Sequence, residues 1–333
     1  MGIKLKDIGE INLIKHLQNT IHYTHPSIIV GIGDDAAVIK NSFNKYLVAT
    51  TDTLVENVHF NLKTFNPYQV GWKSAASNLS DIAAMGAQPK YLLVSMGIPE
   101  NLTLSFWDEI YRGIRELSSN YEACIIGGNT VRSTKLFINI TLLGEVEKDN
   151  YIKRKGATIG EKLIVTGYLG DSWAGFNILE NSININKKAK EFLINKHLLP
   201  QPRINEGLII SKNKIASCMI DISDGLSNEL YRLKEENKIG FKVFEEKIPC
   251  SPALKIFSQK KNINLTEIAL SGGEDYELLF TCKENKLKIL QDAKIDFFVI
   301  GETISENEVI ILNKKGDSRI IKKSGYEHFK NNY

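Results

Sequence analysis

Residues 66–87 read NPYQVGWKSAASNLSDIAAMGA, and this stretch indicates the fold class. Asn66 is a suitable helix cap, and Pro67 then takes the first helical position, so the pattern predicts a helix that runs to about Gly86. Its alanine, serine and glycine side chains are small, which predicts close packing of the helix against a sheet. Asp81 is unusual in such a helix because its neighbours leave little solvated face.

Apolar runs that are typical of strands lie on both sides of this helix: SIIVGIG, KYLVATTDTLV, CIIGG, LFINITLLGEV, EKLIVTG, CMIDISDG, FKVFEEKI, DFFVIGETI and EVIILN. Further helices are predicted over residues 105–120 and 227–237, and residues 1–17 have the pattern of an amphipathic helix. LFINITLLGEV and the strands near it are typical of antiparallel meanders. The alternation of helices and strands therefore predicts a mixed α/β (α+β) fold rather than a purely parallel sheet.

The polar stretch DNYIKRKGATIGEK separates a long strand from a new series of strands and helices. It predicts a boundary near residue 150, with one domain over 1–150 and a second over 151–333. The polar loop and helix expected over 181–196 have no assignable function.

The composition excludes several classes of protein. The chain of 333 residues is 43% hydrophobic and 24% charged, with a formal charge of +3 and no long basic block, which disfavours a nucleic-acid partner. No apolar run approaches the roughly 20 residues needed to span a bilayer. The cysteines, at 124, 218, 250 and 282, lack the spacing of metal ligands, so we expect buried, reduced thiols in a cytoplasmic protein.

Eight acidic residues stand beside small residues at strand ends or within a buried helix: Asp34, Asp35, Asp52, Asp81, Asp221, Asp224, Glu274 and Asp275. Taken singly, an aspartate in such a place usually caps a helix or a turn. If they converged, each like-charged pair about 4 Å apart would cost on the order of 4 kcal/mol at an effective dielectric constant near 20. Cations between them would remove that cost. Oxygen ligands without His or Cys favour Mg²⁺ over Zn²⁺.

Several Mg²⁺ ions in one site usually imply a polyphosphate that shares them. The chain has no GxxxxGK[ST] loop, no dinucleotide fingerprint and no protein-kinase HRD or DFG motif. We therefore expect phosphate to be held by metals, by the glycine backbone of GGN at 127–129 and by Arg154.

The motifs GIGDDAAV, TDTLVENVHF, NLSDIAAMGA, IGGNTVRS, DISDG, SGGEDYELLF and GYEHF, in this order from about residue 30 to residue 329, resemble those of the thiamine-monophosphate kinases. That family belongs to the superfamily of aminoimidazole ribonucleotide synthetase. The resemblance implies transfer of the γ-phosphoryl group of ATP onto thiamine monophosphate, with several Mg²⁺ ions. It also implies a homodimer built on N-terminal domains that bind ATP and Mg²⁺, with C-terminal α/β domains that complete the active-site cleft.

The resemblance also implies roles for particular residues. Asp35, Asp52, Asp81 and Asp221 are the candidate catalytic residues. The implied metal ligands are these four with Asp224, Thr50 and Thr51, the threonines through hydroxyl or carbonyl oxygens, and Asp34 supports them. The implied ATP contacts are Gly128, Asn129, Arg154 and Ser223, and the implied substrate contacts are His59, Glu274 and Tyr326.

Other interpretations of the substrate contacts stay open. His59 is equally explained as a core or turn residue, and Tyr326 as an aromatic that docks the end of the chain. Glu274 would lie beside the cationic thiazolium ring, and the glycines before it would let the backbone approach the ligand. Asn129 departs from the family, which commonly has Asp there, so one metal position is expected to be weaker.

Two rival functions remain. One is another enzyme of the superfamily, such as the synthetase itself, selenophosphate synthetase or the hydrogenase-maturation dehydratase. Selenophosphate synthetase has a reactive Cys or selenocysteine near its N-terminus, whereas none of the first 123 residues here is Cys, and the maturation protein ends in Cys, whereas this chain reads NNY at its end. The other rival is a non-catalytic nucleotide-binding scaffold, which would not be expected to keep so many carboxylates.

Overall fold

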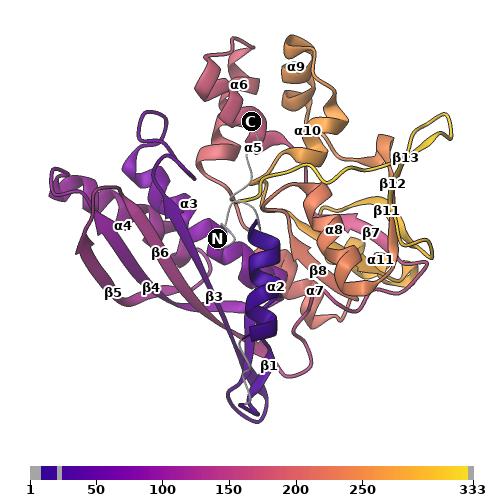
Figure 1. The fold of residues 1–333 in the computed structure, drawn as a ribbon, viewed down its shortest axis with the longest axis horizontal. Coiled ribbons are helices and arrows are strands. Elements are labelled where there is room, and N and C mark those ends of the chain that lie inside the picture. Colours follow the sequence, from indigo (N-terminus) through magenta and orange to yellow (C-terminus); the bar gives the residue numbers. More distant parts are fainter. Residues whose placement is uncertain (1–8, 21–24, 329–333) are drawn as a thin grey trace, which may run out of the picture.

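A computed structural model of the chain describes residues 9–20 and 25–328 (Figure 1). The N-terminal half contains a six-stranded sheet in the order β1-β2-β3-β6-β4-β5. Its strands are β1 (Ile28–Val30), β2 (Ala37–Lys40), β3 (Lys45–Val55), β4 (Gln88–Ile98), β5 (Cys124–Arg132) and β6 (Phe137–Glu147). Strands β4 and β5 are parallel and the other pairs are antiparallel, so the predicted mixed sheet is confirmed.

Strand β6 does not extend a meander with its neighbours in sequence, as LFINITLLGEV had suggested. It inserts between β3 and β4, antiparallel to both. The cause is the helical connection from β4 to β5, which makes that pair parallel and leaves β5 at the edge of the sheet.

Helix α3 (Pro67–Ala84) is the predicted helix of small residues. The side chain of Asn66 accepts a hydrogen bond from the backbone N–H of Gln69, and the side chain of Gln69 accepts one from the N–H of Asn66. This capping box and Pro67 fix the start of the helix where the sequence predicts it. The other N-terminal helices are α2 (Glu10–Thr20) and α4 (Leu104–Ser119).

The C-terminal half contains a seven-stranded sheet in the order β13-β12-β9-β11-β7-β10-β8. Its strands are β7 (Lys162–Val165), β8 (Cys218–Asp221), β9 (Gly240–Phe244), β10 (Leu278–Cys282), β11 (Phe298–Ile304), β12 (Val309–Leu312) and β13 (Ser318–Ile320). Only β9 and β12 pair in parallel among these strands. Its helices are α5 (Asp171–Asn181), α6 (Lys187–Leu198), α7 (Ile204–Lys212), α8 (Leu226–Asn237), α9 (Pro252–Lys261), α10 (Leu265–Ser271) and α11 (Leu287–Asp292).

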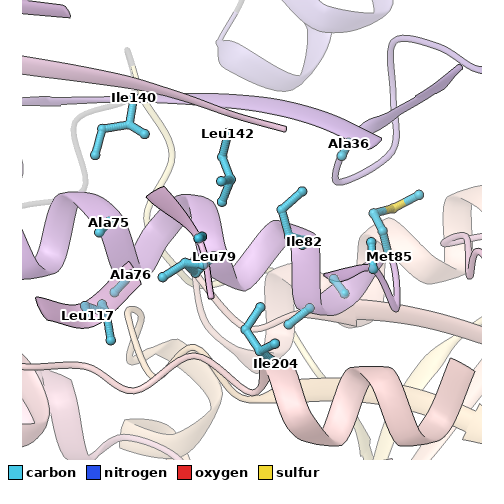
Figure 2. Packing of buried hydrophobic residues seen from close by; sticks show 14 of the residues in the cluster. Ala36, Ala75, Ala76, Leu79, Ile82, Met85, Leu117, Ile140, Leu142 and Ile204 are labelled. Atoms are coloured by element: carbon cyan, nitrogen blue, oxygen red, sulfur yellow. The ribbon is translucent and has the colours of Figure 1, made fainter. Parts of the chain in front are cut away.

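Helix α3 lies between the two halves. Figure 2 shows Ile140 and Leu142 of β6 on one side of this helix and Ile204 of α7 on the other. One hydrophobic cluster therefore includes residues of both sheets, such as Val48 of β3 and Phe280 of β10. Strand β6 ends at Glu147 and β7 begins at Lys162, but because the two halves share this core, the division near residue 150 stays a prediction.

Two further expectations concern the burial of the cysteines and the absence of a membrane-spanning segment. Cys218 and Cys282 are buried and Cys250 is half-buried, but Cys124 is exposed because it begins the edge strand β5, so the expectation of burial is wrong there. Within residues 9–20 and 25–328, every helix is too short or too polar to cross a bilayer.

Candidate active site

Strand β3 and helix α3 bring the first acidic residues together. Alternate residues of β3 point to opposite faces, and those at Thr50 and Asp52 point toward α3. The hydroxyl of Thr50 donates to Oδ2 of Asp81 at 2.6 Å, and the N–H of Asp52 donates to Oδ1 of Asn78 at 3.1 Å. The polar side chains on this buried face of α3 thus bind β3 directly.

Three of the predicted carboxylates converge. Asp35, Asp81 and Asp221 each offer an oxygen atom, and these atoms lie within 4.8 Å of one another. They come from the loop before β2, from α3 and from the end of β8.

One oxygen of each carboxylate in this three-carboxylate cluster has a donor in the protein. These donors are the hydroxyl of Thr50 for Asp81, the hydroxyl of Ser80 for Asp221 and the guanidinium of Arg154 for Asp35. Oδ2 of Asp35 is buried and has no hydrogen-bond partner among the described residues. A buried, unpartnered carboxylate oxygen beside two other carboxylates fits a hard divalent cation such as Mg²⁺.

The electrostatics of the three-carboxylate cluster agree with that assignment. Burial, and then the negative charges of Asp52, Asp221 and Asp35, raise the pKa of Asp81 well above its usual range. Burial and Asp35 likewise raise the pKa of Asp221. Both shifts measure the cost of gathering negative charge away from water, which a bound cation would offset.

Asp34 and Arg154 join two loops beside the cluster. The carboxylate of Asp34 accepts from the backbone N–H of Arg154 at 3.2 Å, and Arg154 Nε donates to Asp35 Oδ1 at 3.2 Å. Burial and the charge of Asp35 raise the pKa of Asp34 to about 7. Asp34 therefore holds the backbone of Arg154, whose side chain holds Asp35.

Asp52 and Asp224 form a second acidic pair near the cluster. Burial raises the pKa of Asp52, and the charge of Asp224 adds to the shift. Arg232 Nη2 donates to Asp224 Oδ2 at 2.6 Å, and the same guanidinium binds Glu229. The hydroxyl of Thr51 lies on the opposite face of β3, 3.2 Å from that of Thr141.

The predicted substrate contacts His59 and Tyr326 meet through His328. His59 Nε2 lies 3.3 Å from Nε2 of His328, and the hydroxyl of Tyr326 lies 3.1 Å from Nδ1 of His328. The N–H of Val55 donates to Nδ1 of His59. Burial, together with the charges of the neighbouring His328 and Lys73, lowers the pKa of His59 to about 4, so the ring is neutral near pH 7.

Glu274, the third predicted substrate contact, is bound by two residues that the motifs had not indicated. Its Oε1 lies 2.6 Å from the ammonium of Lys73, and its Oε2 lies 3.4 Å from Nδ1 of His197. The backbone N–H of Glu274 donates to the carbonyl of Ser223 at 2.7 Å. Glu274 thus connects the loop after β8 to α3.

The loop SGGED serves the protein's own packing. Asp275 accepts from the N–H groups of Gly170 and Ser172 and so caps the N-terminus of α5. A Cβ atom on Gly273 would lie 2.6 Å from the carbonyl oxygen of Ser223. The glycines therefore allow close approach of the protein's backbone segments, where the sequence had suggested approach of a ligand.

The comparisons with known proteins agree with this geometry. Family models described as AIR synthase related protein, N-terminal and C-terminal domain, match residues 33–146 and 158–313. The thiamine-monophosphate kinase of Aquifex aeolicus is 34% identical over 98% of this chain and its own full length, and that of Bacillus subtilis is 36% identical over 97% of this chain. The chain belongs to the thiamine-monophosphate kinase family.

Solved structures of the same and of related families match the fold. The structure described as AaThiL complexed with AMPPCP and TMP has a TM-score of 0.88 at 34% identity and covers 98% of this chain and 99% of its own. The hydrogenase maturation protein HypE of E. coli matches at a TM-score of 0.67 and 19% identity, over 83% of this chain and 85% of its own, which shows a common fold alone. The rival enzyme of the superfamily therefore has weaker support than the thiamine-monophosphate kinase family.

Two of the predicted ATP contacts lie away from the cluster. Gly128 and Asn129 belong to β5, three strands from β3 and at the outer edge of the sheet (Figure 1), so about 14 Å separates them from Asp52 within one chain. Asn129, which departs from the family pattern, is exposed. The packing of the sheet itself requires glycine at position 128, because a Cβ there would lie 1.8 Å from the carbonyl oxygen of Val94.

Lys73 and Ser80 are two of the residues of the site that sequence reasoning missed. Lys73 is the only cation in α3, and its side chain is 1% exposed. Lys73, like Asp81, is a charged residue in a helix of small residues with little solvated face, so the sequence marks both in the same way. Ser80 gave no signal, because serine is common in helices that pack closely.

Proposed function

We propose that this chain transfers the γ-phosphoryl group of ATP to thiamine monophosphate and releases thiamine diphosphate and ADP. The observation that carries the proposal is the convergence of Asp35, Asp81 and Asp221 within 4.8 Å, in a chain 34% identical along its length to a thiamine-monophosphate kinase. The structure of AaThiL with AMPPCP and TMP supports ATP and thiamine monophosphate as the two substrates.

We assign the metal site to Asp35, Asp81 and Asp221, with Asp52, Asp224 and Thr50 as further ligands. Thr51 can join them only through its backbone carbonyl, because its hydroxyl lies on the opposite face of β3. When bound there, Mg²⁺ would neutralise the charge on the transferred phosphoryl group and align the phosphates. The protein itself orients the ligands, because the hydroxyls of Thr50 and Ser80 fix one oxygen of Asp81 and of Asp221. The guanidinium of Arg154 has five N–H donors and makes three hydrogen bonds, two to Asp35 and one to the carbonyl of Gly33, which leaves donors for a phosphate of ATP.

We assign the acceptor side to His59, Glu274 and Tyr326, with Ser223 toward ATP. The attacking atom is an oxygen of the phosphate of thiamine monophosphate, so the reaction needs no strong general base. Neutral His59 and the part-exposed carboxylate of Glu274 instead bind and orient the substrate. Asn129 and Gly128 fit this scheme only if a second chain supplies them.

We propose a homodimer that packs through the open face of the N-terminal sheet. On that face and edge Tyr91, Leu93, Ile126 and Val131 are between 38% and 56% exposed, an apolar surface that a partner would cover. Thr51 pairs with Thr141, and Asn129 pairs with Ser95. Both pairs lie on the side of the sheet away from α3, so Thr51 and Asn129 also point to the open face. Two-fold packing of the face would bring β5 of one chain toward β3 of its partner.

The test is direct. The chain is incubated with ATP, Mg²⁺ and thiamine monophosphate, and thiamine diphosphate is measured by chromatography. We expect product with thiamine monophosphate, none with thiamine and none when a chelator removes Mg²⁺. Absence of product from thiamine monophosphate under saturating ATP and Mg²⁺ would refute the proposal. Since cells keep ATP in the cytoplasm, we also propose a cytoplasmic location, which fractionation of the cells can check.

A further inference from the structure

Lys73 is a buried cation that contacts both halves of the molecule. Its side chain, from α3, is 1% exposed, and its ammonium lies 5.1 Å from the centre of the Phe65 ring. The ammonium donates to the backbone carbonyl of His59 at 2.7 Å and lies 2.6 Å from Oε1 of Glu274. A buried lysine is rare unless it is paired, and this one has two acceptors from distant segments.

The two acceptors belong to different halves. His59 follows β3 of the N-terminal sheet, and Glu274 precedes β10 of the C-terminal sheet. Both were assigned to the acceptor substrate above, on other grounds than Lys73. One ammonium therefore fixes the relative position of two groups that have to bind one molecule.

Glu274 requires such an anchor. Its backbone has a φ of 64°, in the left-handed region that a residue other than glycine seldom adopts, and Tyr276 two positions later has a φ of 52°. A strained loop persists only where contacts fix it. The side chain is still 30% exposed, so its carboxylate can accept a hydrogen bond from a ligand while Lys73 holds Oε1.

A role in stability alone explains this arrangement less well. A buried ion pair seldom stabilises a protein more than apolar side chains of similar size would. The neighbouring His197 does not supply a second positive charge, because burial and Lys73 lower its pKa to about 3. Lys73 is therefore the cation that fixes the position of Glu274.

We propose that Lys73 is a positioning residue for the acceptor substrate, which aligns Glu274 with His59 across the two halves of the chain. This inference rests on the proposed function, because it takes thiamine monophosphate as the molecule that both groups bind. It predicts a defect confined to that substrate, since the contacts of Lys73 do not include the three-carboxylate cluster.

The first experiment is steady-state kinetics of Lys73→Met, which keeps the length of the side chain and removes its charge. We expect KM for thiamine monophosphate to rise about 10-fold or more, as a displaced binding group causes, with KM for ATP within about twofold of the wild type. Lys260→Met, on the exposed end of α9, is the matched control and should change neither constant. Equal changes in both KM values, or no change, would overturn the inference.

A double-mutant cycle separates positioning from folding. If Lys73 acts through Glu274, the variant with both Lys73→Met and Glu274→Gln should bind thiamine monophosphate no worse than Glu274→Gln alone. Additive losses would count against the inference. Should Lys73→Met not fold, Lys73→Arg keeps the charge but changes the donor geometry, and the same selective rise in KM is expected. A wild type without kinase activity would instead refute the proposed function.

Discussion

The hydroxyl of Ser80 donates a hydrogen bond to Oδ2 of Asp221 at 2.6 Å, and both residues are buried. Ser80 belongs to α3 of the N-terminal half and Asp221 to β8 of the C-terminal half. Because Asp81 follows Ser80 directly, one turn of helix presents a ligand and also orients the ligand that comes from the other sheet.

Replacing Ser80 should therefore weaken metal binding without touching a ligand. We expect Ser80→Ala to raise the Mg²⁺ concentration for half-maximal activity by roughly 10- to 100-fold, as loss of a residue that orients a ligand commonly does. Titration of the activity with Mg²⁺ measures this. Ser74→Ala is the control, because Ser74 is buried in the same helix and its hydroxyl donates only to the carbonyl of Val70. Equal shifts in both variants would contradict the prediction.

His197 should make the stability depend on pH. Burial and Lys73 lower its pKa from 6.5 to about 3 in the folded chain, against the opposing charge of Glu274. Between these values the unfolded chain binds a proton that the folded chain does not, so stability is lost as the pH falls below 6.5.

We expect the wild type to lose about 2 kcal/mol more than His197→Asn in the free energy of unfolding between pH 7 and pH 5. Denaturant unfolding at both pH values measures the difference. The variant is expected to be less stable at pH 7, since it leaves a cavity beside Phe65 and Phe176. Parallel pH profiles would show that the ring of His197 is not held neutral.

Asn129 should govern the requirement for metal. It brings an uncharged amide to a position where the family commonly has Asp, so Asn129→Asp should lower the Mg²⁺ concentration needed for half-maximal rate. Asn150→Asp, at a site in the loop after β6, adds the same charge elsewhere and serves as the control. An unchanged or higher requirement in Asn129→Asp would mean that residue 129 does not approach a metal.

The homodimer predicts that two inactive variants restore activity together. Asn129→Lys and Asp81→Asn, co-expressed with different tags, give a heterodimer that is purified on both tags. If each site takes Asp81 from one chain and Asn129 from its partner, the heterodimer has one intact site and about half the activity of the wild type. If both residues act within one chain, the heterodimer has no intact site and stays inactive.

Much of this architecture could be predicted from local signals. Asn66 and Pro67 predict where α3 begins, because a helix cap and a proline act within one turn of helix. The acidic residues beside small residues indicated that any convergence would need cations, and the family resemblance implied that Asp35, Asp81 and Asp221, which lie together in the structure, are metal ligands. The family resemblance then indicated which substrate to expect.

Other features depend on long-range contacts that a linear pattern does not contain. The insertion of β6 between β3 and β4 depends on pairing across some 90 residues, and no turn signal marks it. Glu274 was assigned to a cationic ligand, whereas the structure also gives it a cation of its own in Lys73, 201 positions earlier. The glycines of SGGED were explained by a ligand, although their own backbone neighbours account for them.

The hydrophobic cluster that includes Leu79, Ile204 and Phe280 has a mechanical consequence. The two sheets share one hydrophobic core, so a hinge motion that separates them would expose that core to water and is unfavourable. Nucleotide would then enter and product leave through small movements of surface loops. A cross-link between α3 and α7 should therefore leave the turnover rate unchanged.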